Sequence, residues 1–182
     1  HTQELKERLE CYMIKAVREA AVHTRWTDAN AKYENDTTSF IRNVVEDKQL
    51  MEKVASFAEK VAEAGAKISL EQLVLKMTAP GVPDVYQGNE IWDFSLVDPD
   101  NRRPVDFERA RKLLAQVKDE LARDASAALA SAATEWKSGR AKLLMTAKLL
   151  EHRSQHAALF LKGSYEPLRV IGEHAEHVVA YM

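Results

Sequence analysis

Apolar residues recur every three or four positions along most of the chain, with charged residues between them. Residues 3–22 follow this spacing, which predicts an amphipathic helix. Four residues that favour helix caps stand in the next segment: Thr24, Thr27, Asp28 and Asn30. An ordered loop is therefore expected before a second helix over about 31–46.

A third apolar repeat covers residues 48–64, and Gly65 is a typical helix-ending residue. Ser69 with Gln72 matches a capping box, so a separate helix is expected over about 70–78. Pro80 and Gly81 end that helix. Residues 82–86 then predict a short strand, closed by a turn at Gly88 and Asn89.

The second half of the chain also alternates between helical patterns and breaks. Asp106 is a plausible N-cap for a helix over about 107–123. The alanine-rich segment 124–134 is either a surface helix or a linker, and its composition leaves both open. A further helix is expected over about 142–160, with its end at Gly163. Beyond it the period changes, and short strands are expected at 168–171 and 178–181.

The order of helix, strand, polar loop and helix is the one expected where a (β/α)8 barrel closes. The sequence therefore predicts a mostly α chain with short β segments, divided into three parts. Residues 1–123 would be the C-terminal end of a catalytic barrel, 124–162 a helical junction, and 163–182 the truncated start of a β-rich C-terminal domain.

Composition excludes several kinds of protein. The 182 residues carry a formal net charge of -2, and Lys and Arg are scattered rather than gathered into a basic stripe, so a nucleic-acid partner is not expected. No apolar run is long enough to span a membrane, and no signal peptide is evident. A cytoplasmic location follows as the expectation. His at position 1 and the strand-like run at the other end suggest a piece of a longer protein.

Cysteine and histidine offer little chemistry. The single cysteine, Cys11, rules out an internal disulfide and, within a helical pattern, is expected to be a small core residue. His152 and His156 are four residues apart on a helix, and a solvent-facing pair is favoured over a metal site. No metal ligand set is expected.

Residues 79–106 concentrate turn residues, aromatic rings and carboxylates between two helical regions. Aromatic faces can stack on the C–H surfaces of sugars, and carboxylates can bind vicinal hydroxyls through charge-assisted hydrogen bonds. A second interpretation is equally open for these residues. Arg102 and Arg103 could pair with Asp98 or Asp100, so that part of the cluster would be an ion-pair network that orders a loop.

Several segments resemble maltooligosyltrehalose synthases, a family within the α-amylase superfamily. The motifs are DVYQGNE at 84–90 joined to DPDNRRPV at 98–105, HT-x-W at 23–26 with N-x-x-YE at 30–34, WKSGRAKL at 136–143 and FLKGSYEPL at 160–168. Together they cover nearly the whole chain in order. The resemblance implies that residues 82–86 are the eighth barrel strand.

The resemblance also implies a reaction. It is an intramolecular transglucosylation that converts the reducing-end α-1,4 linkage of a maltooligosaccharide to an α,α-1,1 trehalose linkage, without a cofactor. Such retaining chemistry needs a carboxylate nucleophile and a carboxylic acid/base. No nucleophile block is found in the sequence, so no catalytic residue is assigned, and the fragment alone is expected to be inactive. Its partners would be the sugar and the remainder of the catalytic barrel.

The expected contribution of this chain is a wall of the substrate site. The main candidates for substrate contact are Tyr86, Gln87, Glu90 and Trp92, followed by Asp98, Asn101, Arg102 and Arg103. For Arg102 and Arg103, support of the loop is favoured over direct contact with the sugar. Trp26, Asn30 and Tyr33 are weaker candidates, and a packing role is favoured for Trp26.

Two alternative functions stay open. One is a different hydrolase or transglucosylase of the α-amylase superfamily, which product analysis would distinguish. The other is a non-enzymatic helical interaction module, which would fold stably alone and present an apolar helix face to a protein partner.

Overall fold

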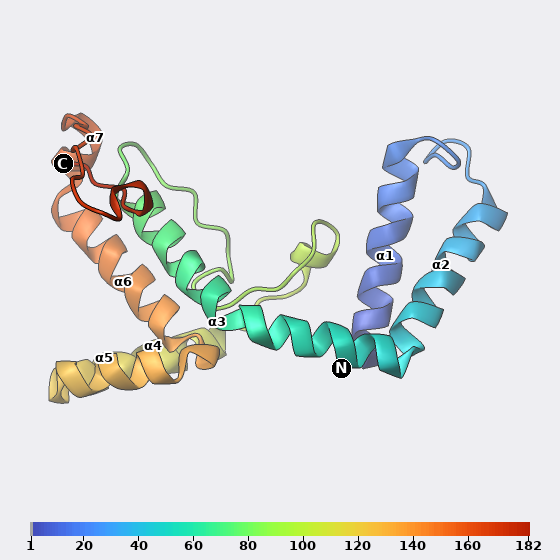
Figure 1. The fold of residues 1–182 in the computed structure, drawn as a ribbon, viewed down its shortest axis with the longest axis horizontal. Coiled ribbons are helices and arrows are strands. Elements are labelled where there is room, and N and C mark those ends of the chain that lie inside the picture. Colours follow the sequence, from blue (N-terminus) through green and yellow to red (C-terminus); the bar gives the residue numbers. More distant parts are fainter. Residues whose placement is uncertain (1) are drawn as a thin grey trace. The chain divides into compact units, whose positions relative to one another are not determined.

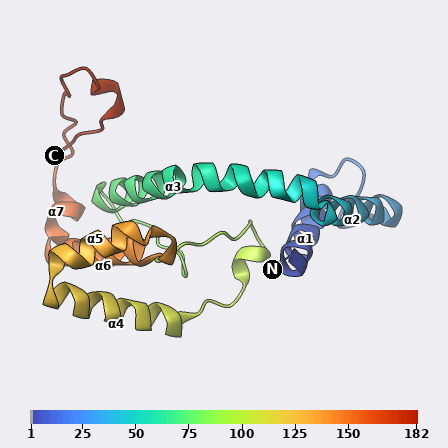
Figure 2. The same cartoon turned by 60° about the horizontal axis from the view of Figure 1, so that its bottom comes forward.

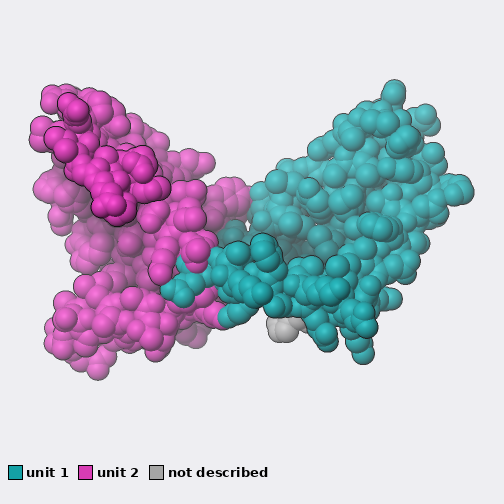
Figure 3. Space-filling view, viewed as in Figure 1, with its two compact units in different colours: residues 1–63, 93–105 teal, residues 64–92, 106–182 magenta. Residues whose placement is uncertain are grey.

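A computed structural model describes residues 2–182 as helices joined by loops (Figure 1). The chain divides into two compact units (Figure 3). Unit 1 comprises residues 1–63 and 93–105, and unit 2 comprises residues 64–92 and 106–182. The segment 79–106 is thereby shared, with residues 79–92 in unit 2 and residues 93–105 in unit 1.

Unit 1 contains a pair of packed helices, α1 (Thr2–Ala20) and α2 (Ala31–Glu46), which lie side by side in Figure 1. Both helices confirm the sequence expectation. Asn30 caps α2, because its side chain accepts a hydrogen bond from the Tyr33 amide at 3.1 Å. Ile41 and Val45 of α2 are buried. The short 3-10 helix η1 (Asp100–Arg102) also contacts α1.

Helix α3 runs without interruption from Lys48 to Thr78. The expectation of two helices separated at Gly65 is therefore wrong. Glycine in a helix interior costs only about 1 kcal/mol relative to alanine, and the residues around Gly65 are mostly alanine, lysine and glutamate, which favour helix. Gly65 does not take the left-handed backbone that would end a helix. Within unit 1, one face of α3 exposes Leu50, Val54, Phe57 and Val61.

Unit 2 is built around three mutually packed helices (Figure 2): α4 (Phe107–Arg123), α5 (Ala125–Thr134) and α6 (Arg140–Gln155). Asp106 caps α4 as expected, by accepting from the Arg109 amide at 2.9 Å. The buried residues include Val117 of α4, Ala128 and Ala132 of α5, and Leu143 of α6.

The alanine-rich segment forms α5, so the helix alternative holds and the linker alternative does not. Alanine at positions 128 and 132 lets the backbone of α5 approach its neighbours closely, while most of the helix stays exposed.

The helix expected over 142–160 begins two residues earlier and is divided at His156 into α6 and α7 (Ala157–Lys162). The remaining short elements are η2 (Trp136–Ser138) and η3 (Ala175–His177).

The expected barrel end and β-rich domain are wrong. Among residues 2–182 there is no strand and no sheet, and the fold is helical. Residues 82–86 are irregular because no second extended segment pairs with their backbone, and a strand exists only through such pairing. Near the C-terminus, one antiparallel bridge joins Pro167 and Tyr181, and the Leu168 amide donates to the Ala180 carbonyl at 2.9 Å.

Among the helices of residues 2–182, none has both the length and the hydrophobicity of a membrane-spanning segment.

Candidate functional site

The loop of residues 79–92 turns tightly within unit 2. Gly81 and Gly88 have φ values of +94° and +87°, a backbone region that L side chains rarely adopt. The Asn89 amide donates to the Tyr86 carbonyl at 3.1 Å and closes the turn. The motif at 84–90 thus presents its side chains from a turn rather than from a strand.

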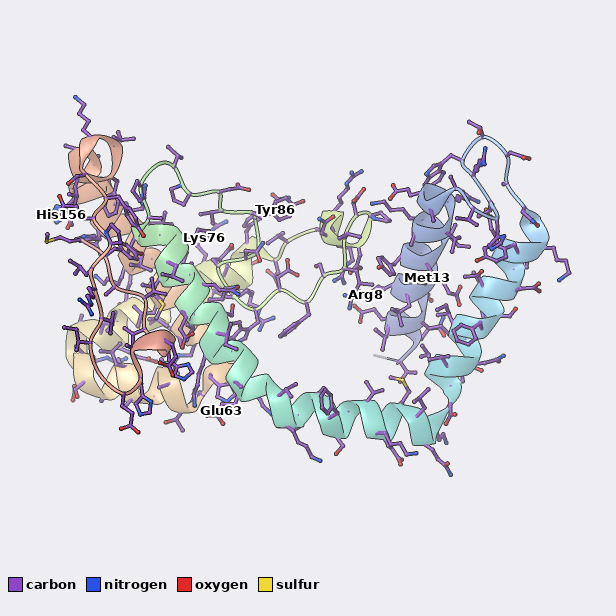
Figure 4. The ribbon with its side chains drawn as sticks, turned by 45° about the horizontal axis from the view of Figure 1, so that its top comes forward. Arg8, Met13, Glu63, Lys76, Tyr86 and His156 are labelled. Carbon is purple, nitrogen blue, oxygen red and sulfur yellow. The ribbon has the colours of Figure 1, made fainter. Side chains whose placement is uncertain are left out.

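A cavity of about 350 Å³ lies beside this turn in unit 2. It is lined by Ser69, Gln72, Leu73 and Lys76 of α3, Asp84, Val85, Tyr86 and Asn89 of the turn, and Lys142 and Thr146 of α6. In Figure 4, Lys76 is labelled on α3 and Tyr86 on the loop that contains the turn. Most lining groups are hydrogen-bond donors or acceptors, as suits a polyhydroxylated ligand. Lys76 and Lys142 were not expected from the sequence, because only tertiary structure brings α3 and α6 to the turn.

Among the main candidates in unit 2, only Tyr86 lines this cavity. Gln87, Glu90 and Trp92 are not part of the lining. Trp92 is half-buried, and its indole Nε1 donates to the Trp136 carbonyl at 2.6 Å. Lys142 places its ammonium 5.4 Å from the centre of the same ring and donates to the Ile91 carbonyl at 3.1 Å. These contacts fix the end of the loop against η2 and α6.

In unit 1, the DPDNRRPV segment is tied to α1 by ion pairs. Arg8 forms a two-pronged pair with Asp100, with Nε to Oδ1 and Nη2 to Oδ2 both at 2.9 Å, and also donates to the Phe94 carbonyl at 2.8 Å. Arg8 is labelled on α1 in Figure 4. The hydrogen bond from Arg8, together with that from the Leu96 amide, outweighs burial and lowers the pKa of Asp100.

The neighbouring charges pair in the same way. Asp98 accepts from Lys15 of α1, and Arg102 donates to its other oxygen at 3.0 Å. The Lys15 hydrogen bond is the main reason that the pKa of Asp98 is lowered. Arg103 donates to the Asp100 carbonyl at 3.1 Å and pairs with Glu4 at 3.2 Å. The ion-pair network that the sequence left open is therefore present.

The HT-x-W and N-x-x-YE motifs meet in a second charged cluster in unit 1. Glu34 accepts two hydrogen bonds from Arg18, at 2.8 and 2.6 Å, and one from the buried Thr24 hydroxyl at 2.6 Å. These bonds, with Arg18 first, lower the pKa of Glu34 to about 2. The Asn30 amide donates to the Thr24 hydroxyl at 3.0 Å. Thr24 and Glu34 thereby hold the loop of residues 21–30.

The three weaker candidates have different surroundings. Asn30 is the cap of α2, and the Tyr33 ring lies 4.9 Å from the His23 ring. Trp26 is 60% exposed, so the expected packing role is not observed. The guanidinium of Arg18 lies 4.9 Å from the centre of its ring.

A second cavity, of about 630 Å³, lies wholly within unit 1. It brings together three of the sequence candidates, Trp26, Asp98 and Arg102, with side chains of α1. Cys11 is exposed and lines this cavity, so the expectation of a core cysteine is wrong. Asn101 and Arg103 are outside the lining.

Comparisons with known proteins agree with the motifs. Proteins from two strains of Mycobacterium tuberculosis, which carry the name maltooligosyl trehalose synthase, are each 36% identical to this chain over 177 residues. The match covers 97% of this chain and 20% of each relative. The chain is homologous to part of the maltooligosyl trehalose synthases. It spans about a fifth of the length of these curated relatives.

Solved structures of maltooligosyl trehalose synthases are similar in fold as well. A crystal structure of that name matches with a TM-score of 0.82 and 34% identity, over 98% of this chain and 23% of the other. The Arthrobacter ramosus synthase gives a TM-score of 0.77 and 35% identity over 97% of this chain and 22% of its own. The Sulfolobus tokodaii structure matches with a TM-score of 0.71 and 35% identity, over 92% of this chain and 21% of its own. No protein-family model matches the sequence.

Proposed function

We propose that this chain is a section of an enzyme that converts the reducing-end α-1,4 linkage of maltooligosaccharides to an α,α-1,1 trehalose linkage. The observation that carries the proposal is the 36% identity to maltooligosyl trehalose synthases along 97% of the chain. A cytoplasmic location and independence from cofactors stay predictions that accompany this function.

The proposed role of the chain is to hold substrate rather than to break bonds. Retaining transfer requires two carboxyl groups across the scissile bond, one as nucleophile and one as acid/base. Asp98 and Asp100 are engaged in ion pairs with cationic side chains and have lowered pKa values. A carboxyl that stays ionised in an ion pair is a poor proton donor. The sequence also contains no nucleophile block, and we therefore propose that the catalytic carboxyls lie outside residues 1–182.

Substrate contact is proposed for the cavity beside the turn at Gly88. The Tyr86 ring offers an apolar face for a pyranose, and Asp84 and Asn89 offer acceptors and donors for its hydroxyls. Lys76 and Lys142 extend the set of donors from two helices. Gln87, Glu90 and Trp92 stay candidates only as neighbours that shape the turn.

To test this, the protein encoded by the full open reading frame is incubated with maltopentaose, and the sugars that form are analysed. The expected product is non-reducing and carries a terminal trehalosyl unit, so reducing ends disappear without a matching release of glucose. Release of new reducing ends without trehalosyl product would assign the enzyme to a hydrolase of the α-amylase superfamily instead. The 182-residue chain, assayed alone, should be inactive.

The role of Tyr86 is tested separately in the same enzyme. Tyr86→Ala is expected to lower kcat/KM about tenfold, equivalent to about 1.4 kcal/mol of lost interaction. Val82→Ala, on the same loop and 85% exposed, is the matched control and should leave kcat/KM unchanged. An unaltered kcat/KM in Tyr86→Ala would remove Tyr86 from the substrate site.

A further inference from the structure

One face of α6 borders the loop of residues 79–92 within unit 2. It carries Lys142, Thr146 and Arg153, whose spacings of four and seven residues bring them to the same side of a helix. Lys142 and Thr146 line the cavity beside Tyr86, whereas Arg153 is not part of its lining. Arg153 lies about 16 Å farther along the helix axis than Lys142, since each helical residue rises roughly 1.5 Å. The helix therefore contacts the loop at two separate levels.

Arg153 binds the backbone where α3 ends and the loop begins. Its Nη1 donates to the carbonyls of Met77, at 2.8 Å, and Ala79, at 3.1 Å, and its Nη2 donates to the Gly81 carbonyl. The last carbonyls of a helix have no partner within the helix and form the negative end of its dipole, so a cation is favoured there. The planar guanidinium presents several N–H groups at once, which lets one side chain hold three carbonyls.

Phe160 of α7 holds both Arg153 and Gly81. The guanidinium carbon of Arg153 lies 4.1 Å from the centre of the Phe160 ring. The Gly81 amide donates to the Phe160 carbonyl at 3.2 Å. Figure 1 and Figure 2 both show the loop leaving α3 near α7. Both backbone polar groups of Gly81 are thus bonded, which fixes the direction in which the chain leaves α3.

These contacts determine where Tyr86 is presented. Tyr86 follows Gly81 by five residues, and its side chain is 42% exposed, so packing alone does not hold it. The Asn89 amide donates to the Tyr86 carbonyl at 3.1 Å and closes the turn. Beyond the turn, Lys142 donates to the Ile91 carbonyl at 3.1 Å. The loop is therefore anchored from α6 at both ends, and release of either end would let Tyr86 shift.

We propose that Arg153 is a positioning residue for the substrate site, which fixes the start of the loop so that Tyr86 stays against the cavity. Because Arg153 does not line the cavity, its effect on the substrate reaches the site through the backbone of the loop. The inference rests on the proposed contact between Tyr86 and the sugar. It adds to that contact a residue of α6 that holds it in place without touching the substrate.

The test is a double-mutant cycle in the protein encoded by the full open reading frame, with maltopentaose as substrate. Arg153→Met is expected to raise KM about tenfold and to change kcat less than about twofold, because a displaced Tyr86 loses binding rather than chemistry. In the Tyr86→Ala background, Arg153→Met should have no further effect on KM, since the contact that it positions is already absent. Arg153→Lys, which keeps the charge but not the planar fork, should recover part of the loss.

The matched control is Lys148→Met, which removes a cation from an exposed position of the same helix. It should leave KM unchanged. All variants are assayed below their unfolding midpoints, and circular dichroism checks that the helices are retained. Loss of folded protein lowers the apparent kcat and not KM, so the two parameters separate positioning from stability. If Arg153→Met does not fold, Arg153→Lys takes its place in the cycle, with an expected several-fold increase in KM.

The proposal would be overturned by an unchanged KM in both Arg153 variants, or by a decrease in kcat alone. Equal increases in KM with and without Tyr86 would also overturn it, because independent effects multiply. An unaltered KM in Tyr86→Ala would leave no contact to position and has the same consequence. The proposed enzymatic function fails separately, through the absence of trehalosyl product. In that case the cycle is measured on the release of reducing ends, and the role of Arg153 stands or falls by the same comparison.

Discussion

Arg8 and Asp100 are 92 positions apart in the sequence and form a bidentate ion pair, with both N–O distances at 2.9 Å. The Asp100 side chain is only 3% exposed, and it also accepts from the Leu96 amide at 2.7 Å. A single carboxylate of η1 therefore joins α1 to the segment that precedes η1. This pair explains how a loop rich in charge keeps one conformation in unit 1.

Removal of the Asp100 carboxylate should destabilise unit 1 strongly. Asp100→Ala leaves Arg8 and the Leu96 amide without their acceptor, and loss of one partner of a buried pair typically costs about 3–5 kcal/mol. Urea denaturation followed by circular dichroism measures the change. Arg102→Ala is the matched control. The Arg102 side chain, which pairs with Asp98, is 70% exposed, and such surface pairs contribute about 0–1 kcal/mol. Equal losses in the two variants would contradict this account.

Stability should fall on acidification because of Glu34. Its pKa in the folded chain is about 2, below the ordinary value of 4.5. A depressed pKa means that the unfolded chain binds a proton more readily, so the stabilisation is complete above pH 4.5 and is lost as the pH falls toward 2. Glu34→Gln should flatten the dependence of the unfolding free energy on pH in this window.

The control for Glu34 is Glu52→Gln, on an exposed position of α3. This variant removes a carboxylate but leaves Arg18 and Thr24 undisturbed. Urea midpoints measured at several pH values between 2 and 6 compare the two proteins. If Glu34→Gln and the wild type lose stability in parallel, Glu34 is not the group responsible.

Two glycines should respond to alanine in opposite directions. Gly139, before α6, has φ of +83°, and a Cβ there would lie 3.3 Å from the Ile91 Cβ. Gly139→Ala should cost about 1–2 kcal/mol because of the left-handed backbone. Gly65→Ala, inside α3 with nothing within 4 Å of its added methyl, should instead stabilise by about 0.5–1 kcal/mol. Thermal unfolding of the two variants shows directly whether each substitution raises or lowers the stability of the protein.

Arg153 should stabilise the end of α3 in unit 2. Its guanidinium donates to the carbonyls of Met77, at 2.8 Å, and of Ala79, at 3.1 Å, and also to that of Gly81. Arg153→Met should cost about 1–3 kcal/mol, since these carbonyls lose a charged donor. Lys148→Met, which removes only an exposed pair with Glu151 on the same helix, should cost less than about 1 kcal/mol. Urea midpoints that shift equally would contradict a special role for Arg153.

Local chemistry explains which helices could be predicted. Asn30 and Asp106 cap α2 and α4 through hydrogen bonds that span only three residues, so the sequence contains all the atoms involved. Gly65 and Ser69 failed as boundary signals because their effect on the backbone is small, and the helix-forming residues around them outweigh it.

The candidate site was predicted only in part. Its motifs were found, and Asp98 with Trp26 and Tyr86 do border cavities. Nothing in the sequence indicated that Lys15 and Lys142 would join them, because Lys15 is 83 positions from Asp98 and Lys142 is 51 positions from Ile91. Lys76 is near Tyr86 in the chain, but only the folded turn brings its side chain to the cavity. Trp92 follows the same motif as Tyr86, yet its indole N–H is held by the Trp136 carbonyl 44 residues later.

Thus the sequence by itself determined the helix caps, the largely helical character and the relationship to maltooligosyl trehalose synthases. These depend on neighbouring residues and on the order of side chains, which a sequence displays directly. Tertiary structure alone decided that residues 82–86 form no strand, that Cys11 and Trp26 are exposed, and that Arg8 holds Asp100. Strand pairing, burial and long-range ion pairs depend on which distant segments meet, and that is fixed only when the chain folds.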